Sequence, residues 1–206
     1  MLVVGAKGHA VEVLQCLGVI EHEHLVFFDD VTPDQPDTLF ETYPVLRTPA
    51  QAQCYLASTD PRFALGLGGP HLRRRLVAQL QAWGGQLTSV IASTAVVSPF
   101  STVGLGVNIM QHTLVSPTAR LGEGVLLNAG AAVHHDSVVG DYCEIAPGAR
   151  ILGHCRIEQG CWIGASAVIL PGVVVGRDAI IGAGAIVTRP VEAGTTVVGI
   201  PARLIG

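Results

Sequence analysis

Aliphatic side chains recur at every sixth position across the second half of this sequence. Seventeen consecutive samples at that spacing, from Ile91 to Val187, are all Ile, Val or Leu. An α-helix repeats its faces about every 3.6 residues and a β-strand at every second residue, so neither element has a period of six. The unbroken period therefore predicts a repeat architecture in which each unit supplies one short strand and one turn.

Three such units make one coil of 18 residues with three flat faces, and coils stack about 4.8 Å apart, as neighbouring strands do. The aliphatic residue points into the column, and a small residue four positions later fills the corner. Cys143, Cys155 and Cys161 fall on that small position, which predicts packed free thiols rather than disulfides. Each coil buries its apolar residues only against its neighbours, as in other solenoids.

The composition is that of an apolar globular protein, with 49% hydrophobic and 14% charged residues among 206. The formal net charge of −4 gives no reason to expect a nucleic acid or an anionic membrane as partner. No apolar run reaches the roughly 18 residues that suggest a membrane span. Met1 leads directly into an apolar strand rather than into a secretory leader. We therefore expect a cytoplasmic protein without a membrane span.

The first 30 residues have the order of a nucleotide-binding βαβ unit. A strand over 2–4 leads into a glycine turn that contains Lys7, Gly8 and His9, and a helix is expected over 10–17. Glycines let the backbone approach a phosphate or sugar, and a helix N-terminus favours an anion. A second strand over 25–28 ends in Asp29 and Asp30. They follow the glycine turn by about 20 residues, which is the sequence separation typical of an acidic residue that binds a ribose hydroxyl. The alternative is a turn that only packs.

The rest of the N-terminal part alternates helices and strands. We expect a loop over 31–44, a helix that begins at Thr48 and Pro49, and a third strand over 63–67. Gly68 precedes a helix that ends at Gly84 and Gly85, and the Arg73–Arg75 run is expected on its wet side. These features predict two domains, an α/β Rossmann-like domain over 1–88 and the column over 89–206.

The hexad that begins at Val133 is the most unusual, because it carries His135 and Asp136 at a turn. An imidazole can take a proton near neutral pH, and a carboxylate can hold its tautomer and stabilise the charged ring. One coil later the same corner has Gly153, which predicts a slot for a slender ligand beside His135. The alternative is a pair of surface side chains that merely face water.

The remaining histidines are weaker candidates for a functional site. We expect His22 and His24 to be solvated, while His112 and His154 lie at single turns of the column. Zinc-dependent β-helix enzymes share three histidines between subunits, and their signature pairs two histidines five positions apart. The sequence has no such pair, so we expect no catalytic metal.

Taken together, these motifs resemble the sugar O/N-acyltransferase family of hexapeptide-repeat proteins, which includes sialic acid O-acetyltransferases and UDP-amino-sugar N-acetyltransferases. The resemblance covers nearly the whole chain. It is carried by residues 4–9, 28–30, 67–68, 128, 135–136, 139–141, 146–149 and 198–202.

The resemblance implies a left-handed parallel β-helix that forms a homotrimer, with acetyl-CoA in the groove between two columns. His135 would be the general base and Asp136 its acidic partner. The family's pattern assigns acceptor binding to Lys7, Gly8, His9, Asp29, Asp30, Gly68 and Asn128. It assigns the acyl-CoA groove to Gly153, Ala165 and Ala183. Glu144 is also expected at the acyl-CoA site, where many relatives have a second histidine that touches the acyl carbonyl.

The function expected from these features is acyl transfer from acetyl-CoA to the nitrogen or oxygen of a nucleotide-activated amino sugar or a related sugar. One alternative is a non-catalytic scaffold whose α/β domain binds a nucleotide. The other is a zinc-dependent protein of the carbonic anhydrase type, which would contain bound metal.

Overall fold

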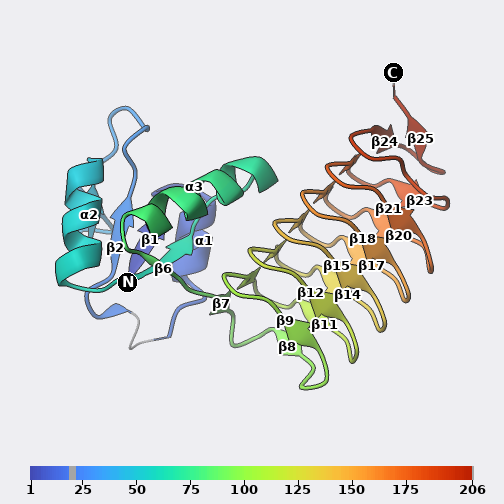
Figure 1. Ribbon diagram of the computed structural model, residues 1–206, viewed down its shortest axis with the longest axis horizontal. Coiled ribbons are helices and arrows are strands. Elements are labelled where there is room, and N and C mark those ends of the chain that lie inside the picture. The colour runs from blue at the N-terminus through green and yellow to red at the C-terminus, as the bar shows by residue number, and fades with distance from the viewer. Residues whose placement is uncertain (19–21, 206) are drawn as a thin grey trace.

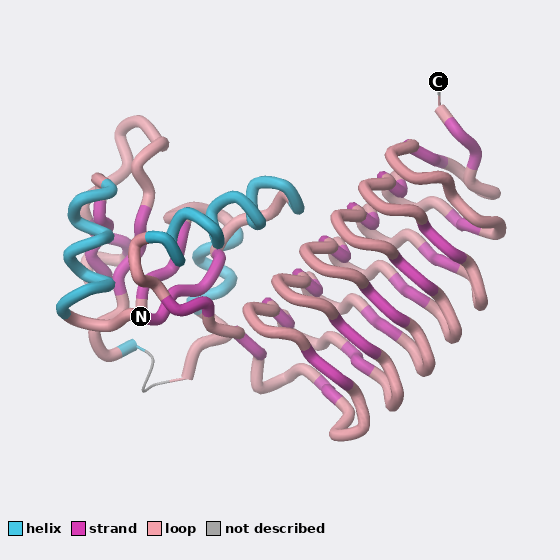
Figure 2. Tube along the Cα trace, viewed as in Figure 1, coloured by secondary structure: helices cyan, strands magenta, loops and turns pink. Residues whose placement is uncertain are grey.

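The computed structural model describes residues 1–18 and 22–205. It consists of an α/β part that contains the N-terminus and a three-faced column that ends at the C-terminus (Figure 1). All helices of the described residues lie in the α/β part, and the column is built from short strands joined by turns (Figure 2). None of the described helices is long and apolar enough to span a membrane.

The α/β part is organised around one six-stranded sheet with the order β3-β4-β2-β1-β5-β6. All neighbours run parallel except β3 and β4. The order reverses between β1 and β5, which is the crevice where open α/β sheets bind ligands. The strands are β1 (Leu2–Val4), β2 (Val26–Phe28), β3 (Thr38–Leu39), β4 (Tyr43–Leu46), β5 (Arg62–Leu65) and β6 (Gln86–Leu87).

Helices cover both faces of this sheet, as expected for a Rossmann-like unit. α1 (His9–Leu14) packs on one face, while α2 (Pro49–Ser58) and α3 (Pro70–Ala82) pack on the other. The predicted start of α2 is confirmed, because Thr48 and Gln51 form a reciprocal capping box and Pro49 occupies the first turn. α1 is shorter than the predicted helix over 10–17.

The predicted loop over 31–44 is wrong in part, because β3 and the beginning of β4 lie within it. Val45 and Leu46 of β4 pair with β2, and β3 folds back on β4 as an edge hairpin. The sequence gives little warning of this hairpin. A strand of two residues has no alternation to recognise, and Pro44 suggests a break in the strand.

The column is a parallel β-helix with one strand on each of three faces per coil, as the six-residue period predicts. Partners in neighbouring coils are 18 residues apart, for example Asn108, Leu126, Glu144 and Trp162. The first face contains β7 (Val90–Ile91), β10 (Asn108–Ile109), β13 (Leu126–Leu127), β16 (Glu144–Ile145), β19 (Trp162–Ile163), β22 (Ile180–Ile181), β24 (Thr196–Val198) and β25 (Arg203–Leu204).

The other two faces have the same register. The second contains β8 (Val96–Val97), β11 (Leu114–Val115), β14 (Ala132–Val133), β17 (Arg150–Ile151), β20 (Val168–Ile169) and β23 (Ile186–Val187). The third contains β9 (Thr102–Val103), β12 (Arg120–Leu121), β15 (Val138–Val139), β18 (Arg156–Ile157) and β21 (Val174–Val175).

The aliphatic residue of most hexads is fully buried in the column, as predicted, and the three column cysteines are buried free thiols. The exceptions lie in the first coil, which no coil precedes: Ile91 has 46% of its surface exposed, and Val97 and Val103 are only partly buried. At the other end β24 continues the first face and β25 pairs with it in the antiparallel sense, so the terminal segment partly covers the column.

A buried arginine joins the two parts of the chain. Arg73 is 0% exposed, and its guanidinium donates to the carbonyl oxygens of Leu67 and Gly124 and to Oδ1 of Asn108. Asn108 in turn donates to the carbonyl of Leu65. The expectation that Arg73 lies on the wet side of α3 is therefore wrong. Burial lowers the pKa of Arg73 to about 10, so the group stays charged at neutral pH.

Adjacent isoleucines of β22 provide a matched test of the column core. Ile181 is 0% exposed and Ile180 is 41% exposed. We expect Ile181→Ala to lower the free energy of unfolding by about 2–5 kcal/mol, since it leaves a cavity between coils. Ile180→Ala should cost less than about 1 kcal/mol. Urea unfolding at fixed protein concentration measures both, and equal losses would contradict the inward and outward assignment.

The junction is tested by replacing Arg73 with an apolar side chain of similar length. Arg73→Met leaves buried acceptors without donors, each of which costs about 1–3 kcal/mol, so we expect a loss of about 2–4 kcal/mol in urea unfolding. Arg74→Met is the control on the exposed side of α3, where Arg74 stacks on Tyr142, 5.1 Å from the ring centroid, and donates one long hydrogen bond of 3.5 Å to Gln159. A loss from Arg74→Met as large as that from Arg73→Met would refute the role of the junction.

Candidate active site

A cleft of about 450 Å³ opens at the carboxyl ends of β1, β2 and β5. Its position is the switch point that the sheet order defines. Among the residues predicted to bind the acceptor, six line this cleft together: Lys7, Gly8, His9, Asp29, Asp30 and Gly68. One wall, contributed by α3, was not predicted from the sequence and consists of Leu72, Arg75 and Leu76.

The glycine turn is shaped by close packing at its first residue. Gly5 has φ +94°, and a Cβ there would lie 3.0 Å from the carbonyl oxygen of Gly66. Gly66 itself has no room for a side chain, since a Cβ would meet that of Ala10 at 2.7 Å. These two glycines let α1 sit directly against β1 and β5, and the turn that bears Lys7 then borders the cleft.

The two aspartates after β2 differ in what their carboxylates contact. Asp29 accepts hydrogen bonds from the backbone N–H groups of Val31 and Thr32 and from the Thr32 hydroxyl. Burial alone would raise the pKa of Asp29, but these hydrogen bonds lower it below its ordinary value. Asp30 is exposed, and its carboxylate has no partner among the described residues. Asp29 therefore orders the loop, and Asp30 is the one free to meet a ligand.

His9 is a mostly buried imidazole in the wall of the cleft. Its Nδ1 lies 3.1 Å from Oε2 of Glu12, and its Nε2 is buried without a hydrogen-bond partner in the parts of the chain that the structure describes. Burial lowers the pKa of His9, with Arg73 acting in the same direction and Glu12 and Glu144 opposing it. The neutral ring donates its one N–H from Nδ1 to Glu12, so the lone pair on Nε2 can accept one hydrogen bond from a ligand.

Glu144 contacts the α/β part rather than the corner that bears His135. Its Oε2 accepts a hydrogen bond of 2.7 Å from the backbone N–H of Gly69, at the N-terminus of α3. Gly68 leaves the space for this contact, because a Cβ there would lie 2.9 Å from the same oxygen. A carboxylate at a helix N-terminus is stabilised by the free N–H groups and the helix dipole.

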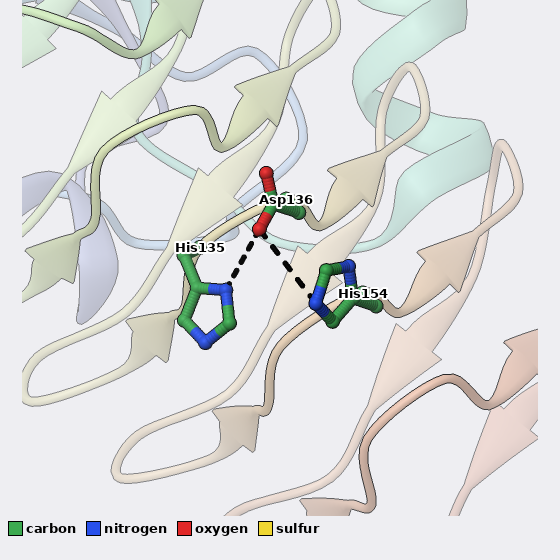
Figure 3. A group of neighbouring side chains, drawn as sticks. All are labelled: His135, Asp136 and His154. Carbon is green, nitrogen blue, oxygen red and sulfur yellow. Dashed lines mark hydrogen bonds and ion pairs between the residues drawn. The ribbon is translucent and has the colours of Figure 1, made fainter.

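The predicted acid–base pair lies at a turn between the second and third faces of the column. His135 Nδ1 is 2.8 Å from Asp136 Oδ2, and the His135 ring packs edge-on against that of His154, with centroids 5.2 Å apart (Figure 3). His135 is 58% exposed and Asp136 44% exposed. The His135 Nε2 has no partner among the described residues, so one nitrogen is held and the other is open.

Thr118, one coil earlier, fixes the carboxylate of Asp136. The Thr118 hydroxyl lies 2.8 Å from Asp136 Oδ1 and also accepts from the Asp136 N–H. The hydrogen bonds from His135 and then from Thr118 lower the pKa of Asp136. Thr118, Asp136 and His154 all have φ close to +60°, so the same left-handed turn recurs at an 18-residue spacing and stacks the three side chains.

The slot predicted beside Gly153 is wrong, because the His135 ring itself occupies it. A Cβ at position 153 would lie 2.6 Å from that ring, and the absence of a side chain is what lets the imidazole rest on the next coil. Asn128, Ala165 and Ala183 lie at another corner, between the first and second faces. The chain thus brings six of the seven predicted acceptor residues together in the cleft, while Asn128 lies apart from them.

The contacts of Thr118 and His154 with Asp136 were not predicted from the sequence. The signal was present in the numbering, since 118, 136 and 154 are one coil apart. His22 was expected to be solvated, but it is half-buried, and its Nδ1 lies 2.7 Å from the hydroxyl of Tyr43. His24 is exposed, as expected.

Two family models match the chain, and together they cover both parts of the fold. The PglD N-terminal domain matches residues 1–80. The bacterial transferase hexapeptide (six repeats) matches residues 118–153 and 154–189. A curated relative, the GDP-perosamine N-acetyltransferase of Escherichia coli O157:H7, is 34% identical over 132 residues. That match covers 63% of this chain and spans 57% of the relative's length.

Solved structures are similar over the whole chain. The acetyltransferase domain of PglB from Neisseria gonorrhoeae FA1090 has a TM-score of 0.89 and 29% identity, over 99% of this chain and 98% of that one. The same domain has been solved in complex with acetyl coenzyme A. PerB from Caulobacter crescentus, in complex with CoA and GDP-perosamine, has a TM-score of 0.87 and 26% identity, over 100% and 96%. WeeI from Acinetobacter baumannii AYE has a TM-score of 0.81 and 30% identity, over 99% and 98%.

His9 makes stability depend on pH in a predictable direction. Because folding lowers the pKa of His9, the unfolded chain binds the proton first as the pH falls. We expect this contribution to be complete above the ordinary histidine value of about 6.5 and to be lost between that value and the lower one of the folded protein. Urea unfolding of His9→Asn should show a smaller loss over this range, while the exposed His112→Asn control should behave like the unsubstituted protein.

Proposed function

Because the chain belongs to the sugar acyltransferase family of hexapeptide-repeat proteins, we propose that it transfers an acetyl group from acetyl-CoA to the amino group of a nucleotide-linked sugar. The observation that carries this proposal is the His135–Asp136 pair, in which Nδ1 is held at 2.8 Å and Nε2 is open. The named activities of the relatives support nitrogen rather than oxygen as the acceptor atom.

His135 acts as the general base. Its Nδ1–H donates to Asp136, so the lone pair of the neutral ring lies on Nε2, where it can take a proton from the acceptor amine. Asp136 then faces the positively charged ring and stabilises it. The low pKa of Asp136 keeps this carboxylate ionised throughout, and Thr118 keeps it oriented.

The nucleotide-linked acceptor binds in the cleft of the α/β part. The glycine turn offers backbone N–H groups to phosphate, Lys7 and Arg75 add positive charge, and Asp30 offers a carboxylate to a sugar hydroxyl. The open Nε2 of His9 provides one further polar contact deep in the cleft.

Free thiols and the absence of a membrane-spanning helix among the described residues agree with the cytoplasm as its location.

Ala165 and Ala183 would hold acetyl-CoA along the column. They lie one coil apart at one corner, where Gly184 donates its N–H to the carbonyl of Ala165 at 2.8 Å, and their small side chains leave the backbone approachable. A long, slender donor fits such a corner better than a corner with large side chains. Acetyl-CoA supplies the activated carbonyl to which the acceptor nitrogen adds.

The active site is shared between copies of the chain. The α/β part packs on the first face of the column through Arg73 and Glu144, whereas His135 lies at the corner between the second and third faces. One chain therefore cannot present its own cleft to its own base. A homotrimer of parallel columns would bring the base of one copy toward the cleft of the next.

The test is turnover of acetyl-CoA with a panel of nucleotide-linked amino sugars, in which mass spectrometry detects the product with one added acetyl group. We expect His135→Ala to lower kcat by about 10²–10⁴-fold, the usual size of general-base catalysis. His112→Ala removes an exposed imidazole at another corner of the column and should retain full turnover. Full turnover in His135→Ala would refute the assigned base, and no product with any acceptor would favour a nucleotide-binding scaffold.

A further inference from the structure

The corner that bears the proposed base also has the donor atoms of a metal site. His135, Asp136 and His154 each offer one ligand atom, and these three atoms lie within 4.8 Å of one another. All three side chains face the same space, with Asp136 between the two imidazoles (Figure 3). The proposed transfer reaction uses His135 and Asp136 but assigns no part to His154, whose Nε2 lies 3.7 Å from Asp136 Oδ2.

The spacing of these atoms is close to what a four-coordinate zinc ion requires. Zinc binds imidazole nitrogen and carboxylate oxygen at about 2.0–2.2 Å, which puts neighbouring ligands of a tetrahedron about 3.4 Å apart. The observed separations from Asp136 Oδ2 are 2.8 Å to His135 and 3.7 Å to His154, one below and one above that value. Small side-chain rotations would equalise them.

The surroundings are also suited to a metal. Thr118 binds Asp136 Oδ1 and leaves Oδ2 for the ion, in the way that outer contacts orient metal-ligating carboxylates. The ring of His135 rests on Gly153, and the backbone N–H of His154 donates to the carbonyl of His135 at 3.0 Å, so the two coils are tied together. Exposure of 58% for His135 and 66% for His154 leaves a path for the ion and a position for water.

We propose that His135, Asp136 and His154 bind a divalent transition-metal ion such as Zn²⁺, and that the bound ion stops acetyl transfer. The second half rests on the proposed function. An ion on Nδ1 of His135 displaces the single proton of the neutral ring, which moves through solvent to Nε2. The nitrogen that would take the proton from the acceptor amine then already carries one, so the base is blocked without any net change in protonation.

Binding is measured first and without any turnover. Full-length protein is freed of metal with a chelator and titrated with Co²⁺, whose visible absorption reports on the coordination geometry. Zn²⁺ is then added in competition. The work uses a Cys54→Ser background, because Cys54 is an exposed free thiol that could bind these ions on its own. We expect one Co²⁺ per chain, displaced by Zn²⁺.

His154→Ala and His112→Ala are the matched variants, since both remove an exposed imidazole from a left-handed turn of the column. His154→Ala should weaken Co²⁺ binding by about tenfold or more, and His112→Ala should leave it unchanged. His112→Ala should keep its basal turnover. Because His154 contacts both His135 and Asp136, inhibition of His154→Ala by Zn²⁺ is expressed relative to the turnover of that variant without metal. Acetylated product is followed by mass spectrometry, since released CoA thiol binds zinc. His154→Ala should require about tenfold more Zn²⁺ for half-inhibition.

Equal Co²⁺ affinities in His154→Ala and in the unsubstituted background would overturn the site. If metal binding depends on His154 but Zn²⁺ leaves turnover unchanged, the proposed inhibition by the bound ion is wrong. Because the Co²⁺ titration needs no acceptor, it decides the site even if the proposed transfer reaction proves wrong.

Discussion

The register of 18 residues between neighbouring coils is the constraint on which the rest of this structure depends. From β7 to β23 each strand of the column pairs in parallel with the strand one coil away, so position n lies against position n + 18. This rule buries one aliphatic residue per hexad, and it also stacks the turns. Because the turns stack, three polar residues that are far apart in sequence, Thr118, Asp136 and His154, become neighbours. The core and the candidate site thus have one cause.

The junction between the two parts uses a different kind of interaction. A fully buried guanidinium replaces water for three acceptors that belong to both parts of the chain. Buried charge of this kind is tolerated only where every donor finds an acceptor, which demands a defined geometry. The contact of Glu144 with the N-terminus of α3 adds a second polar tie on the same face of the column. Together they hold the cleft at a fixed orientation relative to the coils.

The fold could be predicted from the sequence because its signal is periodic, and periodic signals average over many residues. The candidate site could be predicted from the sequence only in part. The pairing of His135 with Asp136 is local and was expected, as were the cleft residues around the glycine turn. The environment of Arg73 and Glu144 could not be predicted, because it depends on how the α/β part docks against the column. The slot beside Gly153 failed for a similar reason, since the rotamer of His135 decides whether that space is open. His154 was within reach of the 18-residue rule, because it follows Asp136 by 18 positions, just as Gly153 follows His135.

The stacked turns also repeat at a regular distance along the column axis. The left-handed corner recurs at Thr118, Asp136 and His154, so comparable backbone platforms occur at successive heights. Arg73 holds the α/β part at the coil of Asn108 and Gly124. The coil that carries His135 and Asp136 therefore sets the distance, along the column axis, between that pair and the cleft. In the proposed site formed by parallel columns, this distance would set the separation between the part of the acceptor held in the cleft and the atom that is acylated. Moving the pair by one coil would then change the length of the acceptor that fits by about 4.8 Å.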